Sequence, residues 1–412
     1  MSALASPPIM RAPLQLRYVS MPKHSPLSTL RRIALHHQGL SSTAPFGGGK
    51  QATLKAIEHL SYVQIDTLAV VERAHHHTLW ARIPRYKPAH LEQLLQERAI
   101  FEYWSHAAAF LPMRDYRFAL PRMNAIKRGE SRWFASVSKE TEQGILTRIR
   151  DEGPLRARDF DSPKQAAGNW WNWKPAKKAL EKLFFQGELM ISSREGMQKV
   201  YDLRERVLPA QVNTREPSLR EFAEYLLDSS LRAHGFTSVK QVAHLRQGAG
   251  LRREINALLQ DRVAQGLLAK YSFEGLPTLF ASPDLFESKT PPRHGGLRLL
   301  SPFDNAVIHR ERLQQIFDFS YGIECYVPQA KRQFGYFCLP ILYQDAIVGR
   351  ADCKANRGSR HLDVLHLYIE KTLRDRDEFD AALAVALEKF AAFNGCETYA
   401  ILKSTRIAPL DS

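Results

Sequence analysis

Gln64 and Asp66 are the residues whose types and spacing best suit hydrolytic chemistry. They belong to the run "YVQID", in which polar and apolar residues alternate as they do in a β-strand. Side chains two positions apart on a strand share one face and lie roughly 7 Å apart, so both can reach one water molecule. The carboxylate can accept a proton from that water or stabilise a developing cation, while the amide orients the water.

A structural role explains the same two residues without any chemistry. Asp66 precedes the stretch "TLAVVERA", for which we expect a helix, and aspartate is a preferred N-cap residue. Gln64 fits equally well as a half-buried polar side chain with its hydrogen bonds satisfied. An N-cap also fixes the direction of a carboxylate, so both roles are compatible. The residues alone therefore leave catalysis and capping open.

The histidine run that follows does not have the spacing of a metal site. His75, His76 and His77 are consecutive, so on a helix they point about 100° apart, whereas a helical zinc pair needs i, i+4 spacing. We expect packing and hydrogen bonding from these residues, or contacts with a DNA groove. The four cysteines are no closer than 13 residues, which excludes Cys-x-x-Cys spacing and indicates free thiols: Cys325, Cys338, Cys353 and Cys396. We therefore predict no metal and no cofactor.

Net charge points to a polyanionic partner. The 412 residues contain 58 Lys+Arg and 43 Asp+Glu, a formal charge of +15. Such a balance favours nucleic acid, although a basic enzyme of another kind stays possible at this point. No apolar run approaches the roughly 18–20 residues that cross a bilayer, so no membrane partner is expected.

The middle of the chain has the pattern of a winged helix. We predict a helix over about 141–150, a short second helix, a third helix in "WKPAKKALEKLFFQ", and a hairpin in "LMISSREGMQKVYDL". The third helix would take the recognition position. Four lysines fall on one of its faces, where they would contact DNA phosphates or simply meet water: Lys174, Lys177, Lys178 and Lys182.

The same pattern of helices and a wing recurs before and after this unit, whereas the last quarter of the chain is rich in predicted strands. We therefore predict an α+β protein of tandem winged helix-turn-helix units with a C-terminal β-rich, small barrel-like domain. The expected division is a disordered basic arm at 1–24, winged-helix units at 25–135, 136–212 and 213–290, and the β-rich domain at 291–412.

Three blocks of sequence carry a resemblance to a known family. "YVQIDTLAVVERAHHHTLWARI", "FEYWSHAAAFLP" and the long block beginning "LSPFDNAVIHRERLQQIFDFSYG" resemble, in the same order, the AlkZ/YcaQ family of winged-helix DNA glycosylases. The similarity runs from about residue 27 to the C-terminus. Gln64-Ile65-Asp66 matches the Gln-aliphatic-Asp motif of the YcaQ-like branch. Within the third block, we expect Asp304 to cap a turn, with support of the active channel as the alternative.

The resemblance implies a specific activity. Members of that branch excise N7- or N3-alkylated purines and unhook interstrand crosslinks, so Asp66 would stabilise the sugar cation and deprotonate a water held by Gln64. No lysine lies within the motif, so a monofunctional enzyme that leaves an abasic site is expected. Tyr103 and Trp104 would line an open DNA channel or belong to the core.

The expected partner is double-stranded DNA with alkylated bases or crosslinks, and the expected protein is a monomer in the bacterial cytoplasm, associated with the nucleoid when bound to DNA. The alternative function is that of a non-enzymatic winged-helix transcriptional regulator, in which Gln64 and Asp66 are structural.

Overall fold

A computed structural model gives the fold. It describes residues 26–131, 134, 136–160, 173–246, 248–293, 296–371, 373 and 375–407. The basic arm predicted at 1–24 lies outside the described residues. No helix in the described part of the chain is both long and apolar enough to cross a membrane.

Four helices and a small antiparallel sheet form the first part of the chain. The helices are α1 (Pro26–His37), α2 (Gly49–Leu60), α3 (Ala74–Trp80) and α4 (Pro88–Gln96). The strands are β1 (Val63–Gln64), β2 (Ile100–Trp104) and β3 (Ala108–Pro112), in the order β1-β3-β2. Among the described strands, the motif strand β1 therefore lies at a sheet edge and pairs with β3 alone.

The helix that we predicted directly after Asp66 is wrong. Residues 65–73 form no helix or strand, and α3 begins only at Ala74. The C-terminal domain holds this segment through its backbone, because Ala355 N donates to Val70 O at 2.8 Å and Glu72 N donates to Asn394 Oδ1 at 2.6 Å. These tertiary hydrogen bonds use backbone groups that a helix would have paired internally.

The second part confirms the predicted hairpin. Its helices are η1 (Met113–Ala119), α5 (Leu120–Lys127), α6 (Lys139–Glu152), η3 (Ala157–Phe160), α7 (Trp173–Gln186) and α8 (Arg204–Val207). Its sheet has the order β4-β6-β5, from β4 (Leu155–Arg156), β5 (Leu189–Glu195) and β6 (Gln198–Leu203). Gly187 follows α7 at φ +72°, as expected for a C-terminal cap.

The third part repeats the arrangement. Its helices are α9 (Leu219–His234), α10 (Val239–Val242) and α11 (Ala249–Ala264), and its sheet has the order β7-β9-β8, from β7 (Phe236–Thr237), β8 (Ala269–Tyr271) and β9 (Leu279–Ala281). A capping box between Ser218 and Glu221 starts α9, and Gly235 at φ +76° ends it.

A six-stranded sheet dominates the C-terminal part. It contains β10 (Leu297–Leu299), β11 (Cys338–Tyr343), β12 (Ala346–Asn356), β13 (His361–Glu370), β14 (Thr398–Ile401) and β15 (Ser404–Ile407), with α12 (Arg310–Phe317), η5 (Gln329–Lys331) and α13 (Arg376–Phe393). The order is β10-β11-β12-β13-β14, and β15 also pairs with β13. The predicted α+β class with a β-rich C-terminal part is confirmed; the sheet curls without closing into a barrel.

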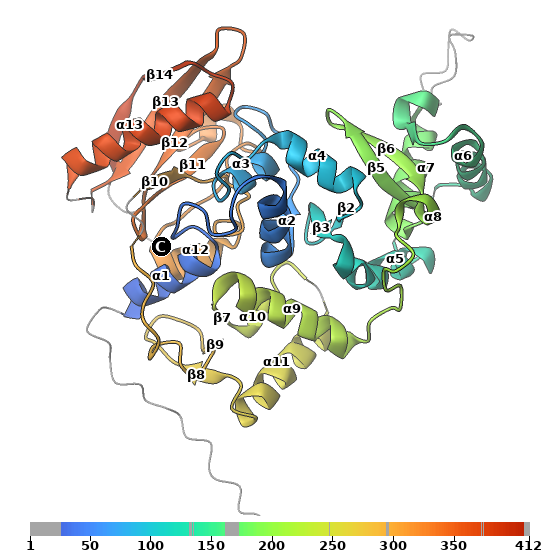
Figure 1. Cartoon of the computed structure of the whole chain (residues 1–412), viewed down its shortest axis with the longest axis horizontal. Helices are drawn as coiled ribbons and strands as arrows, with labels where there is room; N and C mark the ends of the chain where they lie inside the picture. The colour runs from blue at the N-terminus through green and yellow to red at the C-terminus, as the bar shows by residue number, and fades with distance from the viewer. Residues whose placement is uncertain are drawn as a thin grey trace, which may run out of the picture.

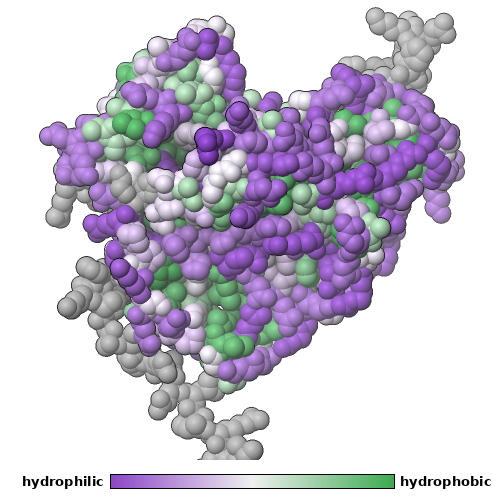
Figure 2. Space-filling view, in the orientation of Figure 1, coloured by the Kyte–Doolittle hydropathy of each residue, from purple (hydrophilic) through white to green (hydrophobic). Residues whose placement is uncertain are grey.

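The parts interlock around shared cores. Figure 1 shows the C-terminal sheet and α13 at one end of the molecule and α6 and α7 at the other, with α2–α4 between them and α9–α11 in the lower part of the view. One hydrophobic cluster runs from Ala52 to Val207, and another joins Leu30 of α1 to Phe236 and Leu342. The outer surface is largely hydrophilic in Figure 2, with hydrophobic residues in scattered patches. The domain boundaries proposed from sequence stay a prediction.

A buried ion pair joins the first part to the C-terminal part. Arg82, directly after α3, donates to both carboxylate oxygens of Asp304 at 2.6 and 2.7 Å, and both side chains are fully buried. The same guanidinium donates to Gln38 O at 2.7 Å and to Thr78 O at 2.8 Å. Asp304 Oδ1 also accepts from Ala306 N at 2.9 Å, so the predicted turn cap is present, together with a structural ion pair.

We expect Asp304→Ala to lower the free energy of unfolding by about 3–5 kcal/mol, because it leaves the Arg82 guanidinium buried without its counter-charge. Urea unfolding followed by fluorescence would measure the change. The matched control is Glu152→Ala, which removes the exposed bidentate partner of Arg148 and should have a much smaller effect on the free energy of unfolding. Equal losses from the two variants would contradict this assignment.

Candidate active site

Gln64 lies on the short strand β1, whereas Asp66 lies in the segment that follows this strand. Gln64 pairs with Ala109 of β3, and Ile65 N donates to Ala108 O at 2.8 Å, so the backbone stays extended through the motif. The side chains of Val63 and Ile65 are buried in the core, 0% and 8% exposed. Gln64 is buried as well, whereas Asp66 is only half-buried.

A tight turn fixes the Asp66 carboxylate. Its Oδ1 accepts a hydrogen bond from Leu68 N at 2.8 Å, two residues further along the chain. The N-cap interpretation of Asp66 is therefore wrong, because the residue before α3 is Arg73. Desolvation by burial raises the pKa of Asp66, and the hydrogen bond from Leu68 opposes that shift only in part. A carboxylate with a raised pKa is a better proton acceptor than an ordinary surface aspartate.

His106 orients the Gln64 amide. Its Nε2 lies 3.0 Å from Gln64 Oε1, and because an amide oxygen only accepts, Nε2 must carry the proton. Burial, together with the nearby His244 and Arg246, lowers the pKa of His106 to about 4, so the ring is neutral near pH 7. The amide NH2 of Gln64 is then left to donate elsewhere. Sequence reasoning did not find this contact.

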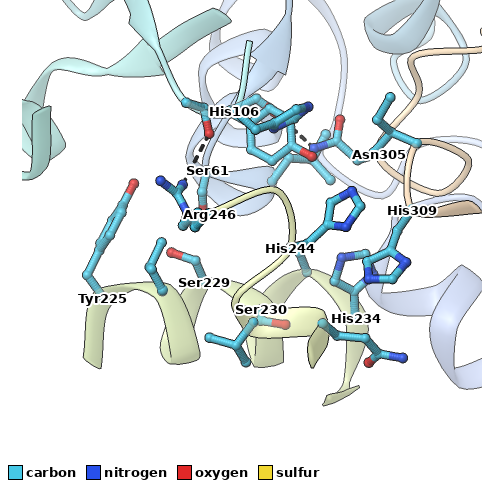
Figure 3. A pocket seen from close by; sticks show the side chains of 18 residues that line it. Ser61, His106, Tyr225, Ser229, Ser230, His234, His244, Arg246, Asn305 and His309 are labelled. Atoms are coloured by element: carbon cyan, nitrogen blue, oxygen red, sulfur yellow. Dashed lines mark hydrogen bonds between the residues drawn. The ribbon is translucent and has the colours of Figure 1, made fainter. Parts of the chain in front are cut away.

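A polar cavity adjoins the motif. It encloses about 100 Å³, and its lining includes Tyr62, His106 and Arg246. Figure 3 shows His244 and Arg246, from the turn after α10, on the side of the cavity opposite His106 and Asn305. Four buried polar atoms of lining residues have no hydrogen-bond partner among the described residues: Gln241 Nε2, His244 Nε2, Asn305 Oδ1 and His309 Nε2. Its size suits about three water molecules next to His106, the partner of Gln64.

The histidine run lies in the protein interior. His75, His76 and His77 are 4%, 8% and 0% exposed. His76 Nδ1 is 2.7 Å from the Tyr86 hydroxyl, and His77 Nε2 donates to Leu299 O at 2.8 Å. Desolvation lowers the pKa of His76 and of His77 to about 4. These positions favour packing over contact with a DNA groove.

The described side chains do not gather into a metal-binding cluster: no group of three His, Cys, Asp or Glu residues among them could hold an ion.

The two aromatic candidates differ in position. Tyr103 is 2% exposed and its hydroxyl donates to Phe185 O at 2.7 Å, which favours a role in the core. Trp104 is only partly buried, with the Arg122 guanidinium 5.1 Å from its ring centre. Contact between Trp104 and DNA stays a prediction.

The lysine face of α7 lies partly against α6. Lys182 pairs with Glu142 at 2.6 Å, and Lys178 Nζ donates to Ser136 Oγ at 2.8 Å. Lys177 is exposed, and the side chain of Lys174 lies outside the described residues. Contact between these lysines and DNA phosphates stays a prediction.

The fold has a counterpart among solved structures. It is similar to the structure of the DNA glycosylase AlkZ from Streptomyces sahachiroi, with a TM-score of 0.59, 13% sequence identity, and coverage of 91% of this chain and 98% of that chain. At this identity the likeness concerns the fold.

The family follows from the sequence match. Residues 57–393 match the model of the family described as DNA glycosylase AlkZ-like, and the chain belongs to that family. It is therefore a DNA glycosylase, a hydrolase of N-glycosyl bonds that acts on DNA, which confirms the resemblance. The alternative of a non-enzymatic regulator is wrong.

We expect His106→Ala to lower the single-turnover rate of base release about 10-fold, because the buried Gln64 amide loses the hydrogen bond that fixes it. His106→Gln, which keeps a donor, should recover part of that rate. Affinity for the same duplex, measured by fluorescence anisotropy, should change little. A loss confined to affinity would contradict an orienting role for His106.

Proposed function

We propose that Gln64 and Asp66 are the catalytic pair of a monofunctional glycosylase that releases N7- or N3-alkylated purines and unhooks interstrand crosslinks. The observation that carries the proposal is the half-buried Asp66 carboxylate, with its raised pKa, two residues from an amide that His106 orients. Family membership supports glycosylase chemistry; the lesion class is the part proposed here.

The chemistry needs little beyond these two side chains. An N-alkylated purine carries a positive charge and leaves readily, so positive charge builds up on the sugar in the transition state. A carboxylate beside the sugar stabilises that charge, as in glycoside hydrolysis. Asp66 then accepts a proton from the attacking water, and the Gln64 NH2 donates a hydrogen bond to the oxygen of that water. Water adds to the sugar carbon, and the products are the free base and an abasic site.

The size of the neighbouring cavity supports crosslinks as substrates. Enzymes that flip a base enclose it in a fitted pocket, and pockets for small molecules usually span roughly 300–1,000 Å³. The cavity next to His106, the partner of Gln64, encloses only about 100 Å³. A base tied to the opposite strand cannot enter a deep pocket. An enzyme that acts at a shallow site can attack such a base in place.

The direct test is a duplex with a single N7-methylguanine, incubated with enzyme and then treated with alkali to cleave abasic sites. We expect Asp66→Asn to reduce the single-turnover rate by at least about 10²-fold, since the general base is lost. Binding of the duplex should be largely retained. A nitrogen-mustard crosslink in the same sequence tests unhooking, read as separation of the strands on a denaturing gel. Full activity of Asp66→Asn would refute the catalytic assignment.

The raised pKa of Asp66 predicts an acid limb in the pH–rate profile. The carboxyl group accepts a proton only when ionised, that is, above its own pKa. Burial raises this pKa above the usual aspartate value, so the rate should fall at a higher pH than an exposed aspartate would dictate. Single-turnover rates between about pH 8 and pH 4, corrected for spontaneous base loss, would show the limb. A rate independent of pH over that range would contradict this role.

A further inference from the structure

Two of the most exposed large hydrophobic side chains lie at the two ends of the motif. Leu245 is 63% exposed and Tyr326 is 79% exposed. Single exposed hydrophobic residues are normal on proteins and need no explanation by themselves. Here, however, each one stands on a short segment that the structure fixes against the residues around Gln64 and Asp66.

Leu245 occupies the turn between α10 and α11. Its φ is +54°, a left-handed conformation that costs a residue with a Cβ roughly 1–2 kcal/mol. Both neighbours line the cavity beside the motif: Arg246 donates to Ser105 Oγ at 3.4 Å, and the His244 ring lies 6.2 Å from that of His106. The turn is thus anchored inward on both sides of Leu245 while the leucine itself faces solvent.

Tyr326 stands on a loop of the C-terminal part that is closed by one carboxylate. Glu324 accepts hydrogen bonds from the backbone N–H groups of residues 333, 334 and 335 at 2.8–3.0 Å. Ile323 packs on the same hydrophobic cluster as Leu68, the residue whose N–H binds Asp66. Partial burial, Cys325 and the charge of Asp66, in that order, raise the pKa of the Tyr326 hydroxyl, consistent with this proximity.

The two segments approach the motif from opposite ends. The Leu245 turn adjoins the cavity that Tyr62 lines, whereas Ile323 of the Tyr326 loop shares a hydrophobic cluster with Leu68, two residues after Asp66. Four residue steps of extended chain separate Tyr62 from Asp66, which is about 13 Å. A nucleotide held at Gln64 and Asp66 would therefore have an exposed apolar side chain on either side.

We propose that Leu245 and Tyr326 insert into the duplex on either side of the target nucleotide and unstack it from its neighbours. The inference rests on the proposed function, because it places the target at Gln64 and Asp66. Proteins that enter the minor groove commonly use such apolar wedges between base steps, and the larger protein–DNA interface that results offsets the cost of unstacking. A strained, solvent-facing leucine is understandable if its side chain is covered only when DNA is bound.

The test measures unstacking of the bases without base release. A duplex with N7-methylguanine carries 2-aminopurine at the adjacent position, and each variant is made in an Asp66→Asn background so that no base is released. We expect a rise in 2-aminopurine fluorescence on saturation with Asp66→Asn alone, and at least a ~5-fold smaller rise with Leu245→Ala or Tyr326→Ala added. Tyr326→Phe, which keeps the ring, should restore most of the rise.

Leu267→Ala is the matched control, since Leu267 is 60% exposed and lies at the far end of α11. It should leave the fluorescence unchanged. The three substituted side chains are at the surface, and thermal unfolding would verify that each variant is folded. If either alanine variant at 245 or 326 behaves as Leu267→Ala does, the proposal is overturned. Failure of the proposed function would appear differently, as wild-type protein that releases no N7-methylguanine.

Discussion

The Arg82–Asp304 ion pair is the interaction on which the rest of the structure depends. Both charges are fully buried. Because an unpaired buried charge costs several kcal/mol, loss of either residue would destabilise the fold. Arg82 also binds the backbone at Gln38 and Thr78 and thereby ties α1, α3 and the C-terminal part together. The main effect of such a pair is to fix the positions of the three segments, because its hydrogen bonds are satisfied in only one arrangement of them. Its net contribution to the free energy of unfolding is small by comparison with the cost of breaking it.

The motif depends on that constraint through the next residue. Asn305 follows Asp304, and its Nδ2 donates to Tyr62 O at 3.1 Å, which fixes the chain just before β1. Gln64 is then oriented by His106 from the β2–β3 turn, and Asp66 by its own backbone. The site is thus assembled from segments far apart in the sequence. None of the predicted winged-helix units contains all of it.

Local patterns in the sequence were sufficient for part of this structure. The hairpin at β5 and β6 and the Ser218 capping box each depend on residues within a few positions of one another. The segment after Asp66 could not be predicted in this way. Its backbone bonds to Asn394, 322 residues from Glu72, and these contacts prevail over a stretch with helical composition.

The contact between His106 and Gln64 could not be predicted from the sequence for a related reason. The block "FEYWSHAAAFLP" was recognised as a family feature, yet its two strands and the turn between them were not predicted. The contact to Gln64 exists only because β3 pairs with β1 across more than 40 residues. Likewise, the lysine pattern on α7 was correctly placed on a helix, but only the fold shows that Lys182 has a partner in Glu142.

The position of β1 at a sheet edge bears on the tendency of the protein to aggregate. An edge strand presents unpaired backbone groups that can recruit a strand from another chain and start aggregation. Here the strand is only two residues long, and the Tyr62 carbonyl that precedes it is occupied by Asn305. The edge of this sheet therefore offers little template for self-association.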